Sequence, residues 1–184
     1  HPFKLPNTIL YDYVYSFIQN ITFYWKRRIL TKYNKSCLRL LDLGSGNNKF
    51  INYMNQNGWD CNSYDKFSNH STLHSLKSIK DKSYNNITLW HSIEHIHDIN
   101  DLMIDIKRIL ISDGCIYIAC PNYKAIERKY LKENWPAYDI PRHLYHFSYN
   151  SLQILLDKYN IKIVNSYRMY QDTFFNILIS LSKT

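Results

Sequence analysis

The sequence predicts an α/β fold, a doubly wound and mostly parallel sheet with helices on both faces, and two observations support it. Short apolar stretches alternate with longer amphipathic ones between residues 38 and 120. The first apolar stretch enters a turn that contains Gly44 and Gly46, followed by a helix-like pattern. Strands that alternate with helices in this way pair in parallel through right-handed crossovers. We therefore expect ligands to bind beyond the carboxyl ends of the strands, where the strand order reverses.

The N-terminal part of the chain predicts one long helix that starts near Thr8. Apolar and mostly aromatic residues recur there at helical intervals, namely Ile9, Tyr13, Phe17, Ile21, Tyr24 and Ile29. We interpret this aromatic stripe as a packing surface. The basic cluster Lys26-Arg27-Arg28 is interpreted as a solvated helix face, in preference to an RNA or membrane patch.

The stretch from Leu38 to Tyr64 predicts a strand, a turn, a helix and a second strand. The strands are expected at 38–43 and 60–64, with the helix at 49–57. The two glycines let the turn adopt unusual dihedral angles and leave backbone N–H groups of the helix N-terminus free to face a ligand. Asp65 ends the second strand, where an acid in a nucleotide-binding unit accepts hydrogen bonds from ribose hydroxyls.

The segment from 65 to 84 is polar and too short for both a helix and a strand, so we expect a shortened connection with a degenerate or missing third edge strand. The later elements follow more regularly. We expect strands at 87–90, 115–120 and 161–164, helices at 100–111 and 149–158, a turn at Asp113-Gly114, and a long insertion at 123–147. Ser148 is a suitable N-cap for the last helix. The tail at 173–181 fits either a strand or a helix.

Several of these segments together resemble the class I S-adenosylmethionine-dependent methyltransferases. The cofactor-binding half is matched by Leu41-Asp42-Leu43-Gly44-Ser45-Gly46 followed by Asp65. Later segments resemble the family's fourth strand, the turn into its fifth strand, and that strand itself, at 89–96, 108–114 and 115–122. Trp135 together with 139–144 is similar to a bacterial branch associated with methylation of small molecules and surface sugars. The resemblance covers the chain from about Leu38 to Tyr167.

The resemblance implies one domain over residues 1–184, in three parts: an N-terminal helical cap at 1–36, a cofactor-binding core at 37–122, and a substrate-side insertion with C-terminal strands at 123–184. It also implies S-adenosylmethionine as cofactor, with S-adenosylhomocysteine as product. The implied cofactor-binding residues are Asp42, Gly44, Ser45, Gly46, Asp65, His91, Ile93 and Glu94. Asp81 is the available acid for the adenine amino group. Asn48 replaces the usual third glycine and tolerates left-handed dihedral angles.

Methyl transfer requires alignment of a nucleophile with the methyl carbon, and an oxygen nucleophile also benefits from a base. His143 is the first choice for that base, because its loop is expected to overhang the methyl group, and His91 is the second. Asn122, Trp135 and Arg142 are expected to contact the acceptor. Arg142 either holds an acidic group of the acceptor or pairs with Asp139. We expect no metal, because the H-E-x-x-H order is absent around His91 and His95.

Composition leaves alternatives open. The formal net charge of +8 favours anionic partners, so RNA methylation is the alternative to a small-molecule acceptor, although the lysines are scattered. A scaffold or regulatory protein without catalysis is a further alternative, given the short 65–84 segment.

No apolar run reaches membrane-spanning length and the cysteines form no C-x-x-C pair, so we expect a cytoplasmic protein with reduced thiols. Because the chain begins with His1, we expect a fragment. The last strand of the family's C-terminal hairpin is not evident in the tail, and whether the chain stops before it is not indicated. The acceptor and the oligomeric state are not indicated.

Overall fold

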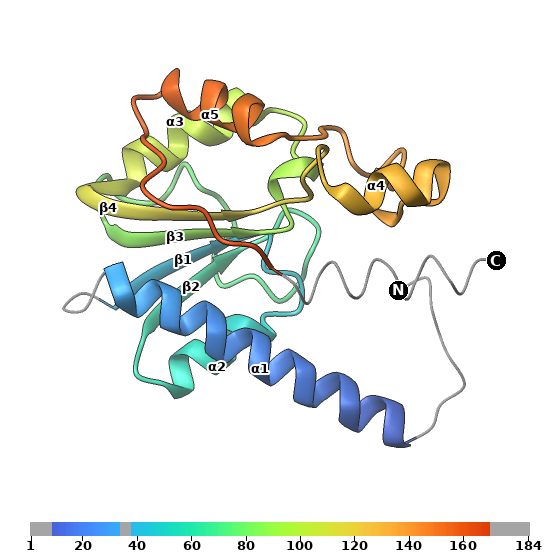
Figure 1. Ribbon diagram of the computed structural model, residues 1–184. Helices are drawn as coiled ribbons and strands as arrows, with labels where there is room; N and C mark the ends of the chain where they lie inside the picture. Colours follow the sequence, from blue (N-terminus) through green and yellow to red (C-terminus); the bar gives the residue numbers. More distant parts are fainter. Residues whose placement is uncertain (1–8, 34–37, 170–184) are drawn as a thin grey trace.

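A computed structural model describes residues 9–33 and 38–169 as a parallel sheet between two layers of helices (Figure 1). The strands are β1 (Arg39–Leu43), β2 (Asp60–Tyr64), β3 (Tyr84–Trp90) and β4 (Leu110–Ala119), in the spatial order β2-β1-β3-β4. Each neighbouring pair is parallel, which confirms the predicted doubly wound α/β fold. From β1 the chain first moves outward to β2 and then returns to the opposite side of β1. The strand order therefore reverses between β1 and β3.

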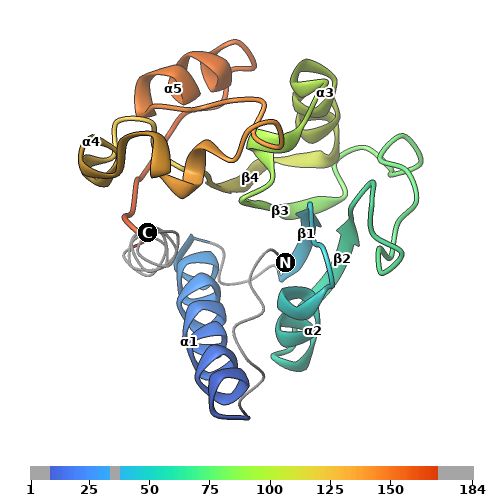
Figure 2. The same cartoon turned by 90° about the vertical axis from the view of Figure 1, so that its right-hand side faces the viewer.

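Both faces of the sheet are covered by helices. Helices α1 (Ile9–Tyr33) and α2 (Lys49–Gln56) lie on one face, while α3 (Ile99–Ile109) and α5 (Tyr149–Asp157) lie on the other, as both views show (Figures 1 and 2). Side chains of β1 alternate between these layers. Leu40 packs with α1 and α2, whereas Leu41 and Leu43 belong to the core beneath α3. Each such burial contributes about 1.5–3 kcal/mol, which explains the apolar run of β1.

Strand β4 begins earlier than the sequence predicts, at Leu110 instead of Cys115. The register against β3 shifts between the pairs Tyr84–Leu110 and Asn86–Cys115, so the residues in between bulge from the ladder. The expected turn at Asp113-Gly114 is therefore part of this bulge. A Cβ at Gly114 would lie 2.7 Å from the Leu110 side chain and 3.0 Å from the carbonyl oxygen of Asn85, so a side chain there would require its neighbours to shift.

The connection from 65 to 83 contains no helix or strand, which confirms the shortened connection and the missing third edge strand. Leu76 and Ile79 anchor it in the core. The Arg108 guanidinium donates to the carbonyl oxygens of both, at 2.8 and 2.5 Å, and forms an ion pair with Asp81 at 2.7 Å. The expectation that Asp81 binds adenine is wrong. Asp81 precedes β3 and thus lies at the amino edge of the sheet, opposite the edge where ligands bind.

The insertion after β4 folds into α4 (Ile126–Leu131) and two short 3-10 turns, η2 (Lys132–Asn134) and η3 (Pro136–Tyr138). Ser148 caps α5 as predicted, because its hydroxyl accepts a hydrogen bond from the Ser151 backbone N–H.

The predicted strand at 161–164 is wrong. Residues 161–169 form no ladder with β4, and the side chains of Asn165 and Tyr167 instead contact α1. The Asn165 amide donates to the Tyr33 hydroxyl at 2.8 Å, and the Tyr167 hydroxyl lies 2.8 Å from the same oxygen. The apolar alternation of Ile161 and Ile163 reflects packing on the core instead of strand pairing. The tail at 173–181 lies outside the described residues.

Among the described helices, none combines the length and the apolar character that crossing a membrane requires. Cys61, Cys115 and Cys120 are free thiols.

Candidate functional site

The turn after β1 places two glycines where the strand order reverses. Gly44 and Gly46 both adopt left-handed angles, with φ of 79° and 56°. The Gly44 N–H donates to the carbonyl oxygen of Tyr64 at 2.8 Å, which joins the turn to the end of β2. On the other side, a Cβ at Gly44 would lie 2.3 Å from the Cβ of Ser92. Only glycine permits this approach between the ends of β1 and β3.

The Asp65 carboxylate connects the same turn to the loop after β2 through hydrogen bonds. Its Oδ2 accepts a hydrogen bond from the Gly46 N–H at 2.9 Å, and its Oδ1 accepts one from the Phe67 N–H at 2.9 Å. The Ser68 hydroxyl donates to the Gly46 carbonyl oxygen. A carboxylate offers about four acceptor positions, so Asp65 keeps capacity for a further donor. Its position at the end of β2 is the one that the sequence predicts.

Two further polar side chains of the turn are buried. Asn48 adopts φ of 59°, which confirms that it takes the left-handed role of a third glycine, and its side-chain amide donates to the His70 carbonyl oxygen. The Ser45 hydroxyl is buried and has no hydrogen-bond partner within the described part of the chain. A buried hydroxyl without a partner is destabilising unless a ligand or water satisfies it, so the turn suits a polar ligand.

Asp42 is a buried acid on β1, with 3% of its surface exposed. Burial raises the pKa of its carboxyl to about 6, while a hydrogen bond from the Thr88 hydroxyl at 2.6 Å and the positive charge of Lys26 act in the opposite direction. The carboxyl is therefore ionised at neutral pH and protonated in mild acid. A buried carboxylate beside the glycine turn attracts a cationic group of a ligand.

Lys26 of α1 is a residue of this region that the sequence analysis assigned to solvent. It is 8% exposed, and its ammonium nitrogen lies 4.3 Å from the ring centroid of Trp90 and 5.3 Å from that of Phe50. The spacing of Lys26 along the helix could have predicted this burial from the sequence. Lys26 is spaced three and four residues from Phe23 and Leu30, so it shares their inward-facing stripe on the helix.

The segment after β3 begins with His91, whose φ is 53° and whose backbone N–H donates to the Ala119 carbonyl oxygen at 2.8 Å. It continues into the 3-10 turn η1 (Ile93–His95). Ile93 is fully buried in the core, which leaves only its main chain for a cofactor contact. Glu94 is 1% exposed, with its Oε1 3.7 Å from Nδ1 of His91, and neither carboxylate oxygen has a hydrogen-bond partner among the described residues.

The loop at 139–147 packs onto this segment. The backbone N–H of Leu144 donates to the Glu94 carbonyl oxygen at 2.8 Å. The rings of His95 and His143 meet edge to face, with 4.7 Å between their centroids. Burial is the main cause that lowers the pKa of His143. Of the two alternatives for Arg142, the structure has the internal pair, since Nη2 lies 2.6 Å from Asp139 Oδ2.

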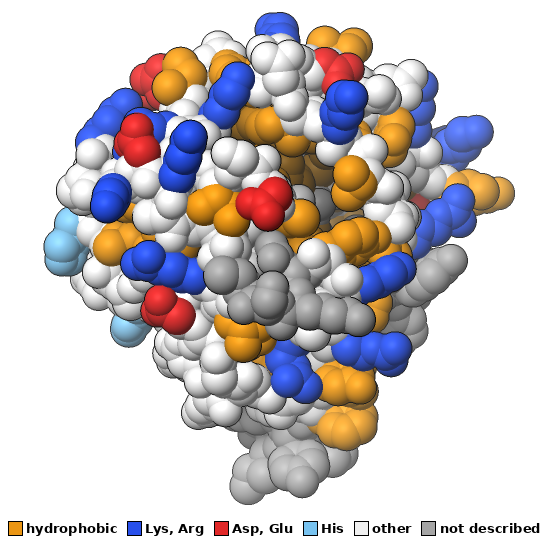
Figure 3. Space-filling view, turned by 90° about the vertical axis from the view of Figure 1, so that its left-hand side faces the viewer, with side chains coloured by type: hydrophobic (Ala, Val, Ile, Leu, Met, Phe, Trp, Pro, Cys, Tyr) orange, Lys and Arg blue, Asp and Glu red, His pale blue; other side chains and the backbone are white. Residues whose placement is uncertain are grey.

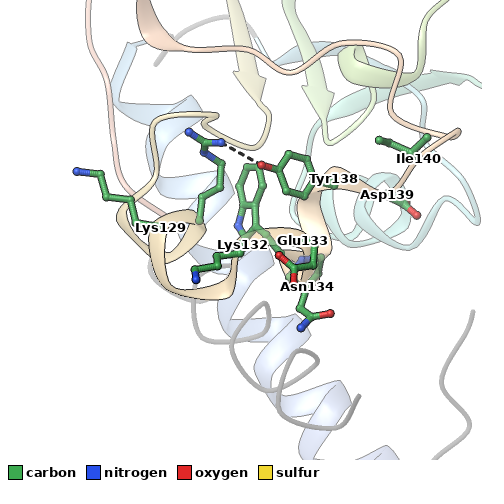
Figure 4. Close-up of a pocket in the computed structure, with 10 residues that line it drawn as sticks. Lys129, Lys132, Glu133, Asn134, Tyr138, Asp139 and Ile140 are labelled. Atoms are coloured by element: carbon green, nitrogen blue, oxygen red, sulfur yellow. Dashed lines mark hydrogen bonds between the residues drawn. The ribbon is translucent and has the colours of Figure 1, made fainter. Parts of the chain in front are cut away.

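The other two predicted acceptor residues are Asn122 and Trp135. Asn122 is exposed, and its side-chain oxygen accepts a hydrogen bond from the Lys124 N–H at 2.9 Å. Trp135 is 2% exposed and contributes to a hollow of about 850 Å³ on the insertion (Figure 4). The hollow is lined by Arg128, Lys129, Lys132, Glu133, Asn134, Trp135, Pro136, Tyr138, Asp139 and Ile140. The predicted residues therefore form two groups: the glycine turn with Asp42 and Asp65, and the segments around Glu94 and His143.

Comparisons with known proteins agree with this arrangement. A family model described as a methyltransferase domain matches residues 14–166. A search of the curated proteins finds no match. Two solved structures are similar in fold. One is a SAM-dependent methyltransferase from Archaeoglobus fulgidus, with a TM-score of 0.61 and 20% identity over 88% of this chain and 86% of that one. The other is the 1,6-didemethyltoxoflavin-N1-methyltransferase of Burkholderia thailandensis, solved with bound 1,6-didemethyltoxoflavin and S-adenosylhomocysteine. Its TM-score is 0.60, and the sequences are 15% identical over 91% of this chain and 86% of that one.

The two glycines of the turn are predicted to respond differently to alanine. Gly44→Ala introduces a clash with Ser92 in addition to backbone strain, so we expect the free energy of unfolding to fall by at least about 3 kcal/mol. Gly46→Ala meets no atom within 4 Å, so only the strain of about 1–2 kcal/mol applies. Urea denaturation of both variants measures the difference. Equal losses would contradict the close contact of the Gly44 turn with Ser92.

Proposed function

The chain belongs to the methyltransferase domain family, as a class I enzyme that depends on S-adenosylmethionine, and from this premise we propose its acceptor class and site. We propose that it methylates a small-molecule acceptor at an oxygen atom. The acceptor oxygen attacks the methyl carbon, and the electron pair of the carbon–sulfur bond moves to sulfur, which gives S-adenosylhomocysteine. The observation that carries the cofactor site is the glycine turn, which the Asp65 carboxylate holds by a hydrogen bond where the strand order reverses. The choice of an oxygen acceptor is supported by His91 and His143 as candidate bases.

The residues around this turn suit the parts of S-adenosylmethionine. Backbone groups of Gly44 and Gly46 would approach the methionine part, together with the unpartnered Ser45 hydroxyl. The Asp42 carboxylate would attract the methionyl ammonium group, directly or through water. Asp65 would accept hydrogen bonds from the ribose hydroxyls with its remaining acceptor positions. The backbone of Ile93 and the side chains of His91 and Glu94 would line the remaining side.

On the acceptor side, the insertion supplies aromatic and basic groups. Trp135 and Tyr138 pack edge to face in the hollow, with 5.1 Å between their ring centroids, and Arg128 donates to the Tyr138 hydroxyl at 2.9 Å (Figure 4). Arg128, Lys129 and Lys132 outnumber the two acids in the lining, which supports an anionic acceptor. His143, with Nδ1 bound to the Ala137 carbonyl oxygen at 2.7 Å, and the exposed His91 are the proposed bases.

The two alternatives receive less support. RNA methylation calls for a continuous basic surface beside the site, whereas the lysines are scattered along the sequence. Figure 3 shows the opposite, amino edge of the sheet, where Lys and Arg side chains are also spread among acidic and apolar ones. A scaffold without catalysis has no need for a buried Asp42 carboxyl, or for a Ser45 hydroxyl that is buried without a hydrogen-bond partner among the described residues. We therefore favour the small-molecule enzyme.

Asp65 and Asp60 stand at opposite ends of β2 and provide a matched pair of variants for a test of cofactor binding. We expect S-adenosylmethionine and S-adenosylhomocysteine to bind the wild-type protein in calorimetric titrations. Asp65→Ala should weaken both at least about tenfold, because bonds between a carboxylate and its donors contribute about 1.5–3 kcal/mol. Asp60→Ala removes only an exposed pair with Arg39 at the amino edge and should leave the affinity unchanged. Absence of cofactor binding to folded wild-type protein would contradict the proposal.

Cofactor affinity is also predicted to depend on pH through Asp42. Because burial raises the pKa of this carboxyl to about 6, its charge is present above that pH and is lost as the pH falls through it. The affinity for S-adenosylhomocysteine, whose amino group stays protonated in this range, should therefore fall between pH 7 and pH 5. Asp42→Asn should bind more weakly at pH 7 and show a flatter profile. The same profile in wild type and variant would rule out the proposed contact with Asp42.

A further inference from the structure

Glu94, His95 and His143 form a cluster that the sequence analysis did not predict. Each offers one ligand atom, and these atoms all lie within 4.8 Å of one another. Glu94 and His95 come from η1, directly after β3, while His143 comes from the loop at 139–147. The loop is held against η1 by the backbone bond from Leu144 to Glu94. The cluster therefore lies at the carboxyl edge of the sheet, on the acceptor side of the proposed cofactor site.

Both histidines present an imidazole nitrogen that is free to act as a ligand. Nδ1 of His95 lies 2.9 Å from the carbonyl oxygen of Arg142, and Nδ1 of His143 lies 2.7 Å from that of Ala137. A carbonyl oxygen only accepts, so each Nδ1 carries the proton and each Nε2 keeps its lone pair. Histidines that bind metals use this arrangement, in which a carbonyl fixes the tautomer and the orientation of the ring.

The third member of the cluster is a buried acid without a hydrogen-bond donor. Glu94 is 1% exposed, and both of its carboxylate oxygens are buried without a hydrogen-bond partner among the residues that the structure describes. Its closest ion-pair partner within those residues is the half-exposed His91, whose Nδ1 lies 3.7 Å from Oε1, beyond hydrogen-bond distance. An ionised carboxylate in this condition is strongly destabilising unless a positive charge compensates it. Asp139 lies 3.8 Å from Nε2 of His143, but its own charge is paired with Arg142.

We infer that Glu94, His95 and His143 bind a divalent transition-metal ion. Two imidazoles and one carboxylate, with a position left open, form the ligand set of catalytic zinc and of related non-haem sites. Ligands about 2.1 Å from a tetrahedral ion lie roughly 3.4 Å apart, so the side chains need to move inward by about 1 Å from their present separation. The absence of an H-E-x-x-H motif does not argue against the site, because its second histidine comes from a distant loop.

This inference rests on the proposed function for the role of the metal ion, and it changes the role of His143. The acceptor hydroxyl would bind the metal ion at its open coordination position. This would lower the pKa of that hydroxyl, so that its proton leaves to solvent or to His91. The resulting oxygen anion attacks the methyl carbon, and the sulfonium receives the electron pair of the broken bond. His143 then holds the metal ion instead of accepting the proton.

Zinc titration of metal-stripped protein tests the site directly. We expect the wild-type chain to bind one equivalent of Zn²⁺ in a tight step measured by calorimetry. His95→Ala and His143→Ala should each weaken that step at least about 100-fold, since loss of groups that only support a ligand already costs 10- to 100-fold. His74→Ala, which removes an exposed histidine of the loop after β2, should leave it unchanged.

Glu94→Gln guards against variants that fail to fold, because glutamine nearly matches the shape of glutamate and removes the buried charge. Zn²⁺ should raise the melting temperature of the wild type but not that of Glu94→Gln. Lack of a tight Zn²⁺ step in the wild type, or the same step in all variants, would overturn the metal site.

Titration of the same samples with S-adenosylhomocysteine separates the two proposals. Cofactor binding without zinc binding overturns only the metal site, whereas zinc binding without cofactor binding supports the site and overturns the proposed function.

Discussion

The close approach of Gly44 to Ser92 is the constraint on which the rest of the site depends. It joins the ends of β1 and β3, where the strand order reverses, and it leaves no room for a side chain. The Gly44 N–H reaches Tyr64 at the end of β2, and the Gly46 N–H reaches Asp65. The ends of three strands are therefore fixed relative to one another by contacts that the main chain of the turn makes. A binding turn held in this way loses little conformational entropy when a ligand arrives.

Two carboxylates at this edge, those of Asp42 and Glu94, are buried in a way that is unfavourable for folding but suits the binding of cations. Because the pKa of Asp42 is raised from 3.8 to about 6, its ionisation destabilises the fold. Its contribution to stability is most favourable below pH 4 and is lost as the pH rises through 6, on the order of 3 kcal/mol in total. Glu94 is buried without any hydrogen bond to its carboxylate within the described residues. Acids that remain in such places are best explained by cations that bind there, the methionyl ammonium group for Asp42 and a metal ion for Glu94.

Local patterns predicted the parts of the fold that depend on local chemistry. The glycine turn, the acid at the end of β2, the left-handed Asn48 and the Ser148 cap follow from backbone preferences of single residues, and the structure has all four. The predictions from sequence failed where contacts between distant segments determine the structure. Ile161 and Ile163 alternate like a strand but pack on the core without a ladder partner, and β4 includes a bulge that the helix-like run to Ile111 concealed. Lys26 is buried by Phe50 and Trp90, and the ligand set of Glu94, His95 and His143 joins two segments far apart in the sequence.

The central claim is that the glycine turn forms a preformed cofactor cradle, and a crystal structure of the protein with S-adenosylhomocysteine tests it most directly. The account predicts the ribose hydroxyls within hydrogen-bond distance of Asp65, the amino acid part against Gly44 and Gly46, and the turn unchanged from its present conformation. A cofactor bound elsewhere, or a turn that must rearrange away from Ser92 to admit it, would contradict the account.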